Sequence, residues 1–215
     1  MLKKNKGLLV LTTFITALPI LVGLLLWKHL PDSIPTHFDI NGVPNGWSSK
    51  AVTVFGIPTF MVAVHLLCSA ITLADPKKQN IQEKVFRLIL WICPLVSVLL
   101  CVTTYPYAMG VEFNTTRIAT LFLGLLFLII GNYLPKCKQN YTVGIKLPWT
   151  LADTDNWERT HRLAGRVWVP CGILIAGASF LGDPGLPVIF ICLAVMTLVP
   201  LLYSFLYYRK KNSGD

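Results

Sequence analysis

Long apolar stretches dominate this chain and restrict what it can fold into. They occupy residues 7–27, 51–74, 88–108, 118–134, 163–181 and 186–208. About 20 apolar residues suffice for a helix to cross a bilayer core, where the backbone must satisfy its own hydrogen bonds. We therefore predict an all-α membrane protein with six transmembrane helices. The run 163–181 is the weakest, because it is long enough only if Arg166 sits at its interfacial end.

The basic residues indicate how these helices are oriented. If both termini are cytoplasmic, sixteen of the 19 Lys and Arg residues fall inside, and only Lys28, Lys50 and Arg117 fall outside. Cytoplasmic loops of membrane proteins carry such an excess of positive charge. The net charge of +9 therefore reflects topology and attraction to anionic lipid headgroups. The bilayer is the expected partner, and direct binding of nucleic acid is not expected.

The six runs pair into three helical hairpins. We predict a single membrane domain, residues 1–215, made of a first hairpin (7–74) with a long outside loop (30–50), a second hairpin (85–134), a long cytoplasmic loop (135–165) and a third hairpin (163–208). Residues 182–185, Gly-Asp-Pro-Gly, are the expected turn of the third hairpin. The basic tail after Tyr208 is expected to be disordered.

The outside loop reads LPDSIPTHFDINGVPNGWSSK and is rich in turn signals. Asn41-Gly42 and Asn45-Gly46 are turn dipeptides, because glycine tolerates positive φ. Three prolines forbid a continuous helix. We expect a small extracellular hairpin, with Phe38 and Trp47 resting on the membrane interface. The candidate contact residues of this loop are Pro31, Pro35, His37, Phe38, Gly42 and Trp47.

Few side chains are suited to catalysis. His65 is the one clear ionisable residue inside a run, and a hydrogen bond to a neighbouring helix is favoured over a proton relay. Four polar residues suggest a metal or enzyme site: Asp153, Asp155, Glu158 and His161. They lack the HExxH spacing, so a solvated helix start capped by Thr154 or Asp155 is the favoured interpretation. We predict no catalytic residue, no bound metal and no cofactor.

The polar stretch at residues 131–165 reads GNYLPKCKQNYTVGIKLPWTLADTDNWERTHRLAG. Its aromatic residues Tyr141, Trp149 and Trp157 are amphipathic. Such residues favour membrane interfaces, and they are also enriched at binding hot spots. The residues alone do not decide between these two interpretations.

The local geometry of this stretch is also predictable. Pro148 restricts Leu147 to extended backbone, and Gly144 permits a close approach of backbone to its surroundings. Residues 157–166 are predicted to form a short amphipathic helix that leads into the fifth run.

The same stretch resembles the signature of the SdpI family of bacterial membrane immunity proteins. The family pattern is a helix ending in Gly-Asn, then Asn-Tyr-x-x-Gly-Ile-(Arg or Lys)-x-Pro-Trp-Thr-Leu, then Trp-x-x-Thr-His-Arg-x-x-Gly. It is matched here by Gly131, Asn132, Asn140, Tyr141, Gly144, Ile145, Lys146, Pro148, Trp149, Thr150, Leu151, Trp157, Thr160, His161, Arg162 and Gly165. Lys146 takes a place often held by Arg. The outside loop is similar to the family's N-terminal domain of unknown function.

The resemblance implies a multi-pass protein of the bacterial cell membrane that protects against a secreted antimicrobial peptide toxin. In the family's best-known system the membrane protein also recruits a cytoplasmic autorepressor when toxin is present. The outside loop would then meet the toxin. The cytoplasmic surface that reports it would consist of Pro148, Trp149, Trp157, Thr160 and His161.

Two alternatives stay open. A transporter or channel-like protein would export or exclude a small amphipathic molecule, and it would need a polar path lined by His65, Thr103, Thr104 and Asn132. A membrane enzyme would use the four polar residues named above, although the sequence contains no positive sign of enzyme activity.

Overall fold

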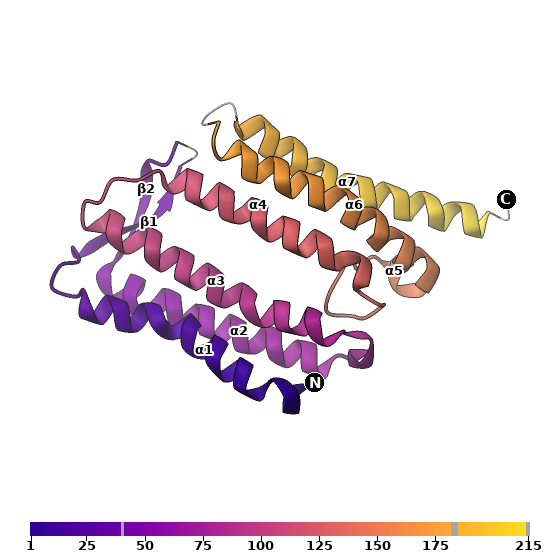
Figure 1. Ribbon diagram of the computed structural model, residues 1–215, viewed down its shortest axis with the longest axis horizontal. Coiled ribbons are helices and arrows are strands. Elements are labelled where there is room, and N and C mark those ends of the chain that lie inside the picture. Colours follow the sequence, from indigo (N-terminus) through magenta and orange to yellow (C-terminus); the bar gives the residue numbers. More distant parts are fainter. Residues whose placement is uncertain (40, 182–184, 214–215) are drawn as a thin grey trace. The chain divides into compact units, whose positions relative to one another are not determined.

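The computed structural model describes residues 1–39, 41–181 and 185–213, most of which are helical (Figure 1). Its elements are, in chain order, α1 (Leu2–Leu25), β1 (Ser33–Phe38), β2 (Pro44–Ser49), η1 (Val52–Gly56), α2 (Ile57–Ala74), η2 (Lys78–Asn80), α3 (Glu83–Ala108), α4 (Thr115–Tyr133), η3 (Leu134–Lys136), α5 (Pro148–Ala152), α6 (Thr154–Ala178) and α7 (Gly185–Asn212). The π-helical turn η1 continues directly into α2.

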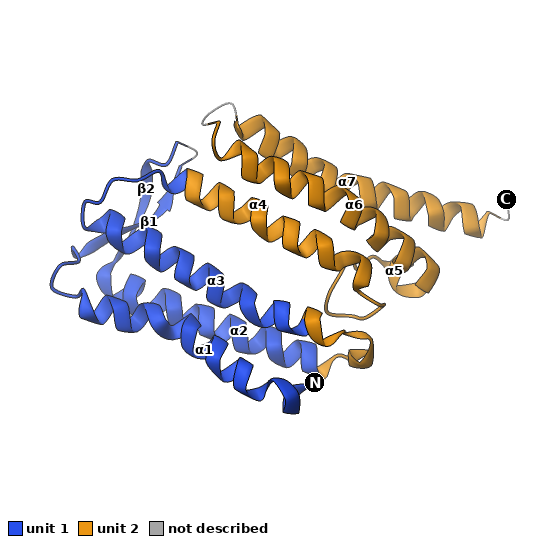
Figure 2. Cartoon of the chain, viewed as in Figure 1, with its two compact units in different colours: residues 1–73, 86–116 blue, residues 74–85, 117–215 orange. Residues whose placement is uncertain are grey.

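The chain divides into two compact units (Figure 2). Unit 1 comprises Met1–Leu73 and Phe86–Thr116, whereas unit 2 comprises Ala74–Val85 and Arg117–Asp215. Each unit contains one of the two long loops predicted from the sequence. The prediction that both belong to a single membrane domain stays a prediction.

Five helical segments of the described residues are long and apolar enough to cross a membrane. They are Leu2–Leu25, Val52–Ala74, Glu83–Ala108, Thr115–Lys136 and Gly185–Asn212. The predicted run 163–181 is absent from this set because it is the second half of α6, where only twelve helical residues follow Arg166. A full crossing needs about 20 residues. The all-α membrane class is therefore supported by five helices, and the sixth span stays a prediction.

Burial in unit 1 is the reverse of that in a water-soluble domain. The side chains of Thr12, Thr16 and His65 are buried, while Leu25 and Phe60 are 82% and 66% exposed. The Thr12 hydroxyl lies 3.2 Å from Nε2 of His65, which joins α1 to α2. This contact confirms the expected hydrogen bond of His65 to a neighbouring helix. Apolar side chains that point outward are suited to lipid.

The outside loop forms the predicted hairpin. Strands β1 and β2 are antiparallel, and Ser33 pairs with Ser49 at the open end. Gly42 has a φ of 79° and lies in the turn, as expected. The second dipeptide was wrongly predicted as a turn, because Asn45 and Gly46 lie within β2 and Gly46 pairs with His37. The buried Ile34 anchors the hairpin in a core with Leu30, Val54 and Tyr105.

In unit 2, glycine permits α4 and α6 to approach closely. A Cβ on Gly124 would lie 2.3 Å from the backbone nitrogen of Ala176, and one on Gly172 would lie 2.5 Å from that of Leu128. Small residues allow this kind of helix packing inside membranes. Helix α7 then packs along α6, around a core of Cys171, Ile175, Cys192 and Met196.

Two further expectations need correction. The tail after Tyr208 is not disordered over its described part, because α7 continues to Asn212 and Lys211 forms an ion pair with Asp153 at 2.8 Å. The N-cap of α6 is Asp153, whose carboxylate accepts from the backbone N–H of Asp155, rather than Thr154 or Asp155. The expected turn at residues 182–185 lies largely outside the described residues.

Candidate functional site

The signature stretch folds into a compact loop between η3 and α6, which we call the island (residues 137–153). Asn140 organises its first part. Its Oδ1 accepts from the backbone N–H groups of Thr142 and Val143 at 2.9 and 2.7 Å. Its Nδ2 donates to the carbonyl groups of Lys138 and Val143 at 2.8 and 3.0 Å. All four hydrogen-bonding positions of this buried amide are therefore used for folding.

His161 holds the second part of the island against α6. Its Nδ1 lies 2.8 Å from the Trp157 carbonyl, one helical turn earlier. Its Nε2 accepts from the backbone N–H of Ile145 at 2.9 Å. Since a carbonyl only accepts, Nδ1 carries the proton and the imidazole is neutral. The predicted helix at residues 157–166 is confirmed as part of α6.

Burial lowers the pKa of His161 to about 4, although the hydrogen bond to the Trp157 carbonyl opposes this shift. The side chain is fully buried and stacks on Trp157, with ring centroids 4.1 Å apart. Trp157 is itself fully buried, and its Nε1 donates to the Cys137 carbonyl at 2.7 Å. A cation at this position would lose solvation without gaining a counter-charge, so the neutral imidazole is favoured at neutral pH.

Gly144 makes this stacking possible. Its φ is 124°, and a Cβ there would lie 2.4 Å from Nε2 of His161 and 2.9 Å from the Trp157 ring. The expected close approach of backbone at Gly144 is therefore confirmed, and its partner is the His161–Trp157 stack.

The corner before α5 is built by Pro148 and Thr150. Leu147 is extended, with φ and ψ of −115° and 153°, as the following proline predicts. The Thr150 hydroxyl accepts from the Leu147 N–H at 2.9 Å and donates to the Ile145 carbonyl at 2.8 Å. Thr150 is fully buried, so its role is to fold the corner.

Trp149 of the island and Asn156 of α6 both hydrogen-bond to Ser204 of α7. Trp149 Nε1 donates to the Ser204 hydroxyl at 2.9 Å. Asn156 donates to the Ser204 carbonyl at 3.0 Å and accepts from the Thr160 hydroxyl at the same distance. Trp149 also packs against the rings of Phe205 and Tyr208.

Sequence reasoning missed the contribution of the loop after α2. Asp75 Oδ2 accepts from the Tyr141 N–H at 2.9 Å and from the Thr142 hydroxyl at 2.5 Å. Burial opposes ionisation of Asp75, but these hydrogen bonds and one from the Lys77 N–H lower its pKa. The only sequence signal was an Asp-Pro pair at a helix end, which does not identify a partner 66 residues away.

Gln139 was missed for a similar reason. Its Nε2 donates to the Thr150 and Leu151 carbonyls at 3.1 and 3.0 Å. Its Oε1 accepts from Lys77 Nζ at 2.6 Å, so a buried amide joins both ends of the island to the loop after α2. No spacing rule identifies such a residue from the sequence.

The signature thus separates into a buried and an exposed set. Trp157, Thr160 and His161 have no exposed surface, so the structure does not place them on the reporting surface expected of them. Gly165 is also buried, against Pro135. The exposed signature residues are Asn132, Tyr141, Lys146, Pro148 and Arg162. Their role in binding stays a prediction.

The residues considered for a metal or enzyme site lie in separate contacts. Asp153 pairs with Lys211, and Asp155 pairs with Arg159 at 2.9 Å and accepts from the Tyr207 hydroxyl. His161 bonds backbone groups through both ring nitrogens. Within the described residues, no three His, Cys, Asp or Glu side chains form a group that could hold a metal.

The outside-loop candidates are dispersed over the hairpin. Pro31, His37 and Trp47 are exposed and Pro35 is buried. His37 contacts the Asn45 side chain, and Phe38 packs edge-on against Tyr107 with ring centroids 5.0 Å apart. The placement of Phe38 and Trp47 at a membrane interface stays a prediction.

Of the residues that a transporter would require, Thr104 lines a cavity of about 100 Å³ in unit 1 together with Pro19, Thr53 and Ser97. Neither His65 nor Thr103 lines that cavity. Asn132 belongs to unit 2 and is exposed.

Comparison with known proteins agrees with the signature. Residues 136–204 match the SdpI/YfhL protein family, and residues 14–62 match the Domain of unknown function (DUF1648). The chain is 31% identical to the Immunity protein SdpI of Bacillus subtilis (strain 168), over 99% of this chain and 100% of that protein. Among solved structures, none matches the chain.

This similarity and the apolar helices make the chain a multi-pass protein of the bacterial membrane. The matched segments include both the hairpin of unit 1 and the island of unit 2. Because the similarity to its relative extends over nearly the whole of both proteins, the chain belongs to the SdpI/YfhL protein family.

Proposed function

We propose that this chain is an immunity protein that protects the bacterial membrane against a secreted antimicrobial peptide toxin. The observation that carries the proposal is its 31% identity to the Immunity protein SdpI over 99% of this chain, which includes both units. The resemblance of the island to the family signature supports the same conclusion. Catalysis is not part of the proposal, because Asp153 caps α6 and pairs with Lys211 while Asp155 pairs with Arg159.

The two units suggest separate tasks within this function. With both termini in the cytoplasm, the hairpin of unit 1 faces the outside, where a secreted peptide arrives. Val43 and Trp47 of this hairpin are 56% and 58% exposed and are available to an amphipathic peptide. The island of unit 2 then faces the cytoplasm. Bound toxin would favour one of two states of the protein, and the island would differ between them.

A survival assay tests the proposal. A toxin-sensitive bacterium that expresses the full chain is expected to survive at least one of a panel of secreted peptide toxins that kills the same cell with an empty vector. Trp149→Ala and His161→Ala are expected to abolish protection, because they remove the contact of Trp149 with Ser204 and that of His161 with Ile145. Trp91→Ala, an equal truncation in α3, is the control and should keep protection.

Membrane levels decide how that assay is interpreted. Immunoblots of isolated membranes should show wild-type amounts of every variant. If the wild type inserts normally and protects against no peptide, the proposed function is wrong. If Trp149→Ala or His161→Ala disappears from the membrane, its loss of protection is caused by failure to fold or insert rather than by loss of a functional contact.

We also propose that the island signals by sequestering a cytoplasmic transcriptional repressor. The exposed signature residues Tyr141, Lys146 and Arg162 combine an aromatic ring with positive charge, which are features of protein-binding surfaces. The buried contacts of Asn140, His161 and Asp75 would hold this surface in shape.

Lys146→Glu separates signalling from protection. In cells carrying a reporter gene under the promoter of the gene for this protein, transcription of the reporter is expected to increase several-fold when toxin is added. Lys146→Glu should lose most of this induction and keep survival, because it reverses one exposed charge without removing a packing contact. Lys84→Glu makes the same charge change on another exposed segment and should keep both. Full induction with Lys146→Glu would show that Lys146 is not part of the surface that binds the repressor.

A further inference from the structure

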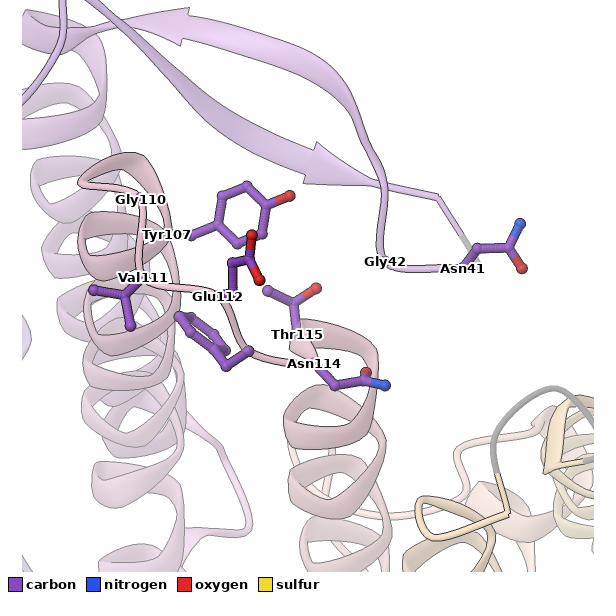
Figure 3. Close-up of a pocket in the computed structure, with 9 residues that line it drawn as sticks. Asn41, Gly42, Tyr107, Gly110, Val111, Glu112, Asn114 and Thr115 are labelled. Atoms are coloured by element: carbon purple, nitrogen blue, oxygen red, sulfur yellow. The ribbon is translucent and has the colours of Figure 1, made fainter.

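A pocket of about 450 Å³ lies in unit 1 between the hairpin turn and the connection from α3 to α4 (Figure 3). Pockets of this size accommodate small ligands or single side chains of a peptide. Gly42 lines it from the hairpin, and Tyr107, Glu112, Phe113 and Thr115 line it from α3, the connection and the start of α4. Both connections are outside loops in the predicted topology.

The walls of this pocket are held in place without a ligand. The Asp39 carboxylate accepts from the backbone N–H groups of Asn41 and Val43, each at 2.9 Å, and so fixes the hairpin turn. Tyr107 packs edge-on between Phe38 and Phe113, with centroid distances of 5.0 and 6.1 Å. This aromatic row connects the hairpin to the opposite wall. Little reordering would be needed on binding, which favours affinity.

Thr115 has an unused polar group in this pocket. Its side chain is 5% exposed, and its hydroxyl has no hydrogen-bond partner among the described residues. A buried polar group without a partner costs about 1–3 kcal/mol. Figure 3 shows this side chain among those that line the pocket, on the side of Glu112 and Gly42. The hydroxyl is therefore positioned to bond a ligand group.

Glu112 supplies the charge of the pocket. Its carboxylate is exposed and forms no hydrogen bond or ion pair with any described residue. The other two carboxylates of unit 1 are engaged, since Asp39 holds the turn and Asp32 pairs with Lys50 at 3.2 Å. The remaining lining includes Tyr107, Val111 and Phe113, which are aromatic or apolar. A carboxylate beside such side chains is suited to an ammonium group attached to an apolar chain.

We propose that this pocket binds an ammonium group of the peptide toxin, from a lysine or the N-terminus, together with an adjacent apolar side chain. Glu112 pairs with the ammonium, Thr115 accepts one of its N–H groups, and Tyr107 and Phe113 contact the apolar part. This inference rests on the proposed immunity function and assigns the place where unit 1 recognises the peptide.

Direct binding tests the assignment. The full chain is placed in nanodiscs of zwitterionic lipid and titrated with two fluorescent, end-blocked apolar peptides, one with a single lysine and one with acetyl-lysine. Empty nanodiscs correct for lipid partitioning. We expect the wild type to bind the lysine peptide about two- to fivefold more tightly, as for an exposed ion pair. Glu112→Gln should bring the ratio to about one, while Asp32→Asn keeps it.

Thr115→Val separates a ligand contact from a structural role. The substitution keeps the shape and removes the unsatisfied hydroxyl, so the melting temperature should be unchanged or higher. Binding of the lysine peptide should nevertheless weaken severalfold. Equal binding of both peptides to the wild type, no binding of either, or unchanged binding by Thr115→Val would each overturn the assignment.

The survival assay separates this inference from the proposed function. If the wild type protects and Glu112→Gln protects equally, the function stands and the pocket is not the recognition site. If no toxin is resisted while the lysine preference persists, the pocket stands as a cation site and immunity fails. Loss of protection by Glu112→Gln at normal membrane levels supports both the immunity function and the pocket as the place where the toxin is recognised.

Discussion

Replacing Gly144 with alanine is expected to destabilise the island by about 2–3 kcal/mol. A residue with a Cβ pays roughly 1–2 kcal/mol to adopt positive φ, and the φ of Gly144 is 124°. The new Cβ would also lie 2.4 Å from Nε2 of His161, so the imidazole must move. Its hydrogen bond from the Ile145 N–H is then lost, which adds about 1 kcal/mol.

Thermal unfolding of the full chain in detergent, followed by tryptophan fluorescence, measures this effect. Gly177→Ala is the matched control, because a Cβ at this position of α6 meets nothing within 4 Å. Alanine favours helix over glycine by about 1 kcal/mol, so the control should be neutral or stabilising. A melting temperature of Gly144→Ala equal to that of the wild type would show that the His161–Trp157 stack does not depend on this glycine.

Acidification is expected to destabilise unit 2 through His161. Its pKa is about 4 in the folded protein and about 6.5 when exposed. Between these values the unfolded state binds the proton and the folded state does not, so stability falls as the pH falls. The loss is about 2 kcal/mol between pH 7 and pH 5, and about 3 kcal/mol by pH 4. Above pH 6.5 the contribution of His161 is fully present and constant.

His161→Gln isolates this contribution, since glutamine retains a donor and an acceptor but does not titrate in this range. The variant is expected to be less stable than the wild type at pH 7, and the difference between the two melting temperatures should shrink toward pH 5. Asp75 has a lowered pKa, so its stabilising contribution stays constant from pH 7 to pH 5 and is lost only at more acidic pH, and it does not mask the change. A constant difference between the two proteins from pH 7 to pH 5 would mean that His161 is solvated or charged in the folded state.

The parts of the chain that the sequence predicts correctly depend on short-range physics. An apolar run such as residues 51–74 has to be helical in lipid, because its backbone has no other hydrogen-bond partners. The proline pattern of the outside loop and the positive φ available to Gly42 favour a hairpin. The signature residues identify the family without any knowledge of their contacts.

The wrong predictions concern residues whose structure depends on a contact with another segment of the chain. Asn45-Gly46 is a good turn dipeptide, but cross-strand pairing of Gly46 with His37 placed it in β2. The tail after Tyr208 lacks an apolar pattern, yet α7 continues there because Lys211 pairs with Asp153 at the start of α6. Lys211 and Asp153 are 58 residues apart, so this contact leaves no local signal in the sequence.

The membrane class, the hairpin and the family could be predicted from the sequence, since each follows from local pattern or residue identity. Which signature residues face solvent depends on how the helices pack. Trp157 and His161 have the character of binding residues, but they are buried against Gly144 and the Cys137 carbonyl. Asp75 and Ser204 entered the site through contacts with residues about 50 or more positions away. Such contacts depend on how helices pack, and no spacing in the chain encodes that packing locally.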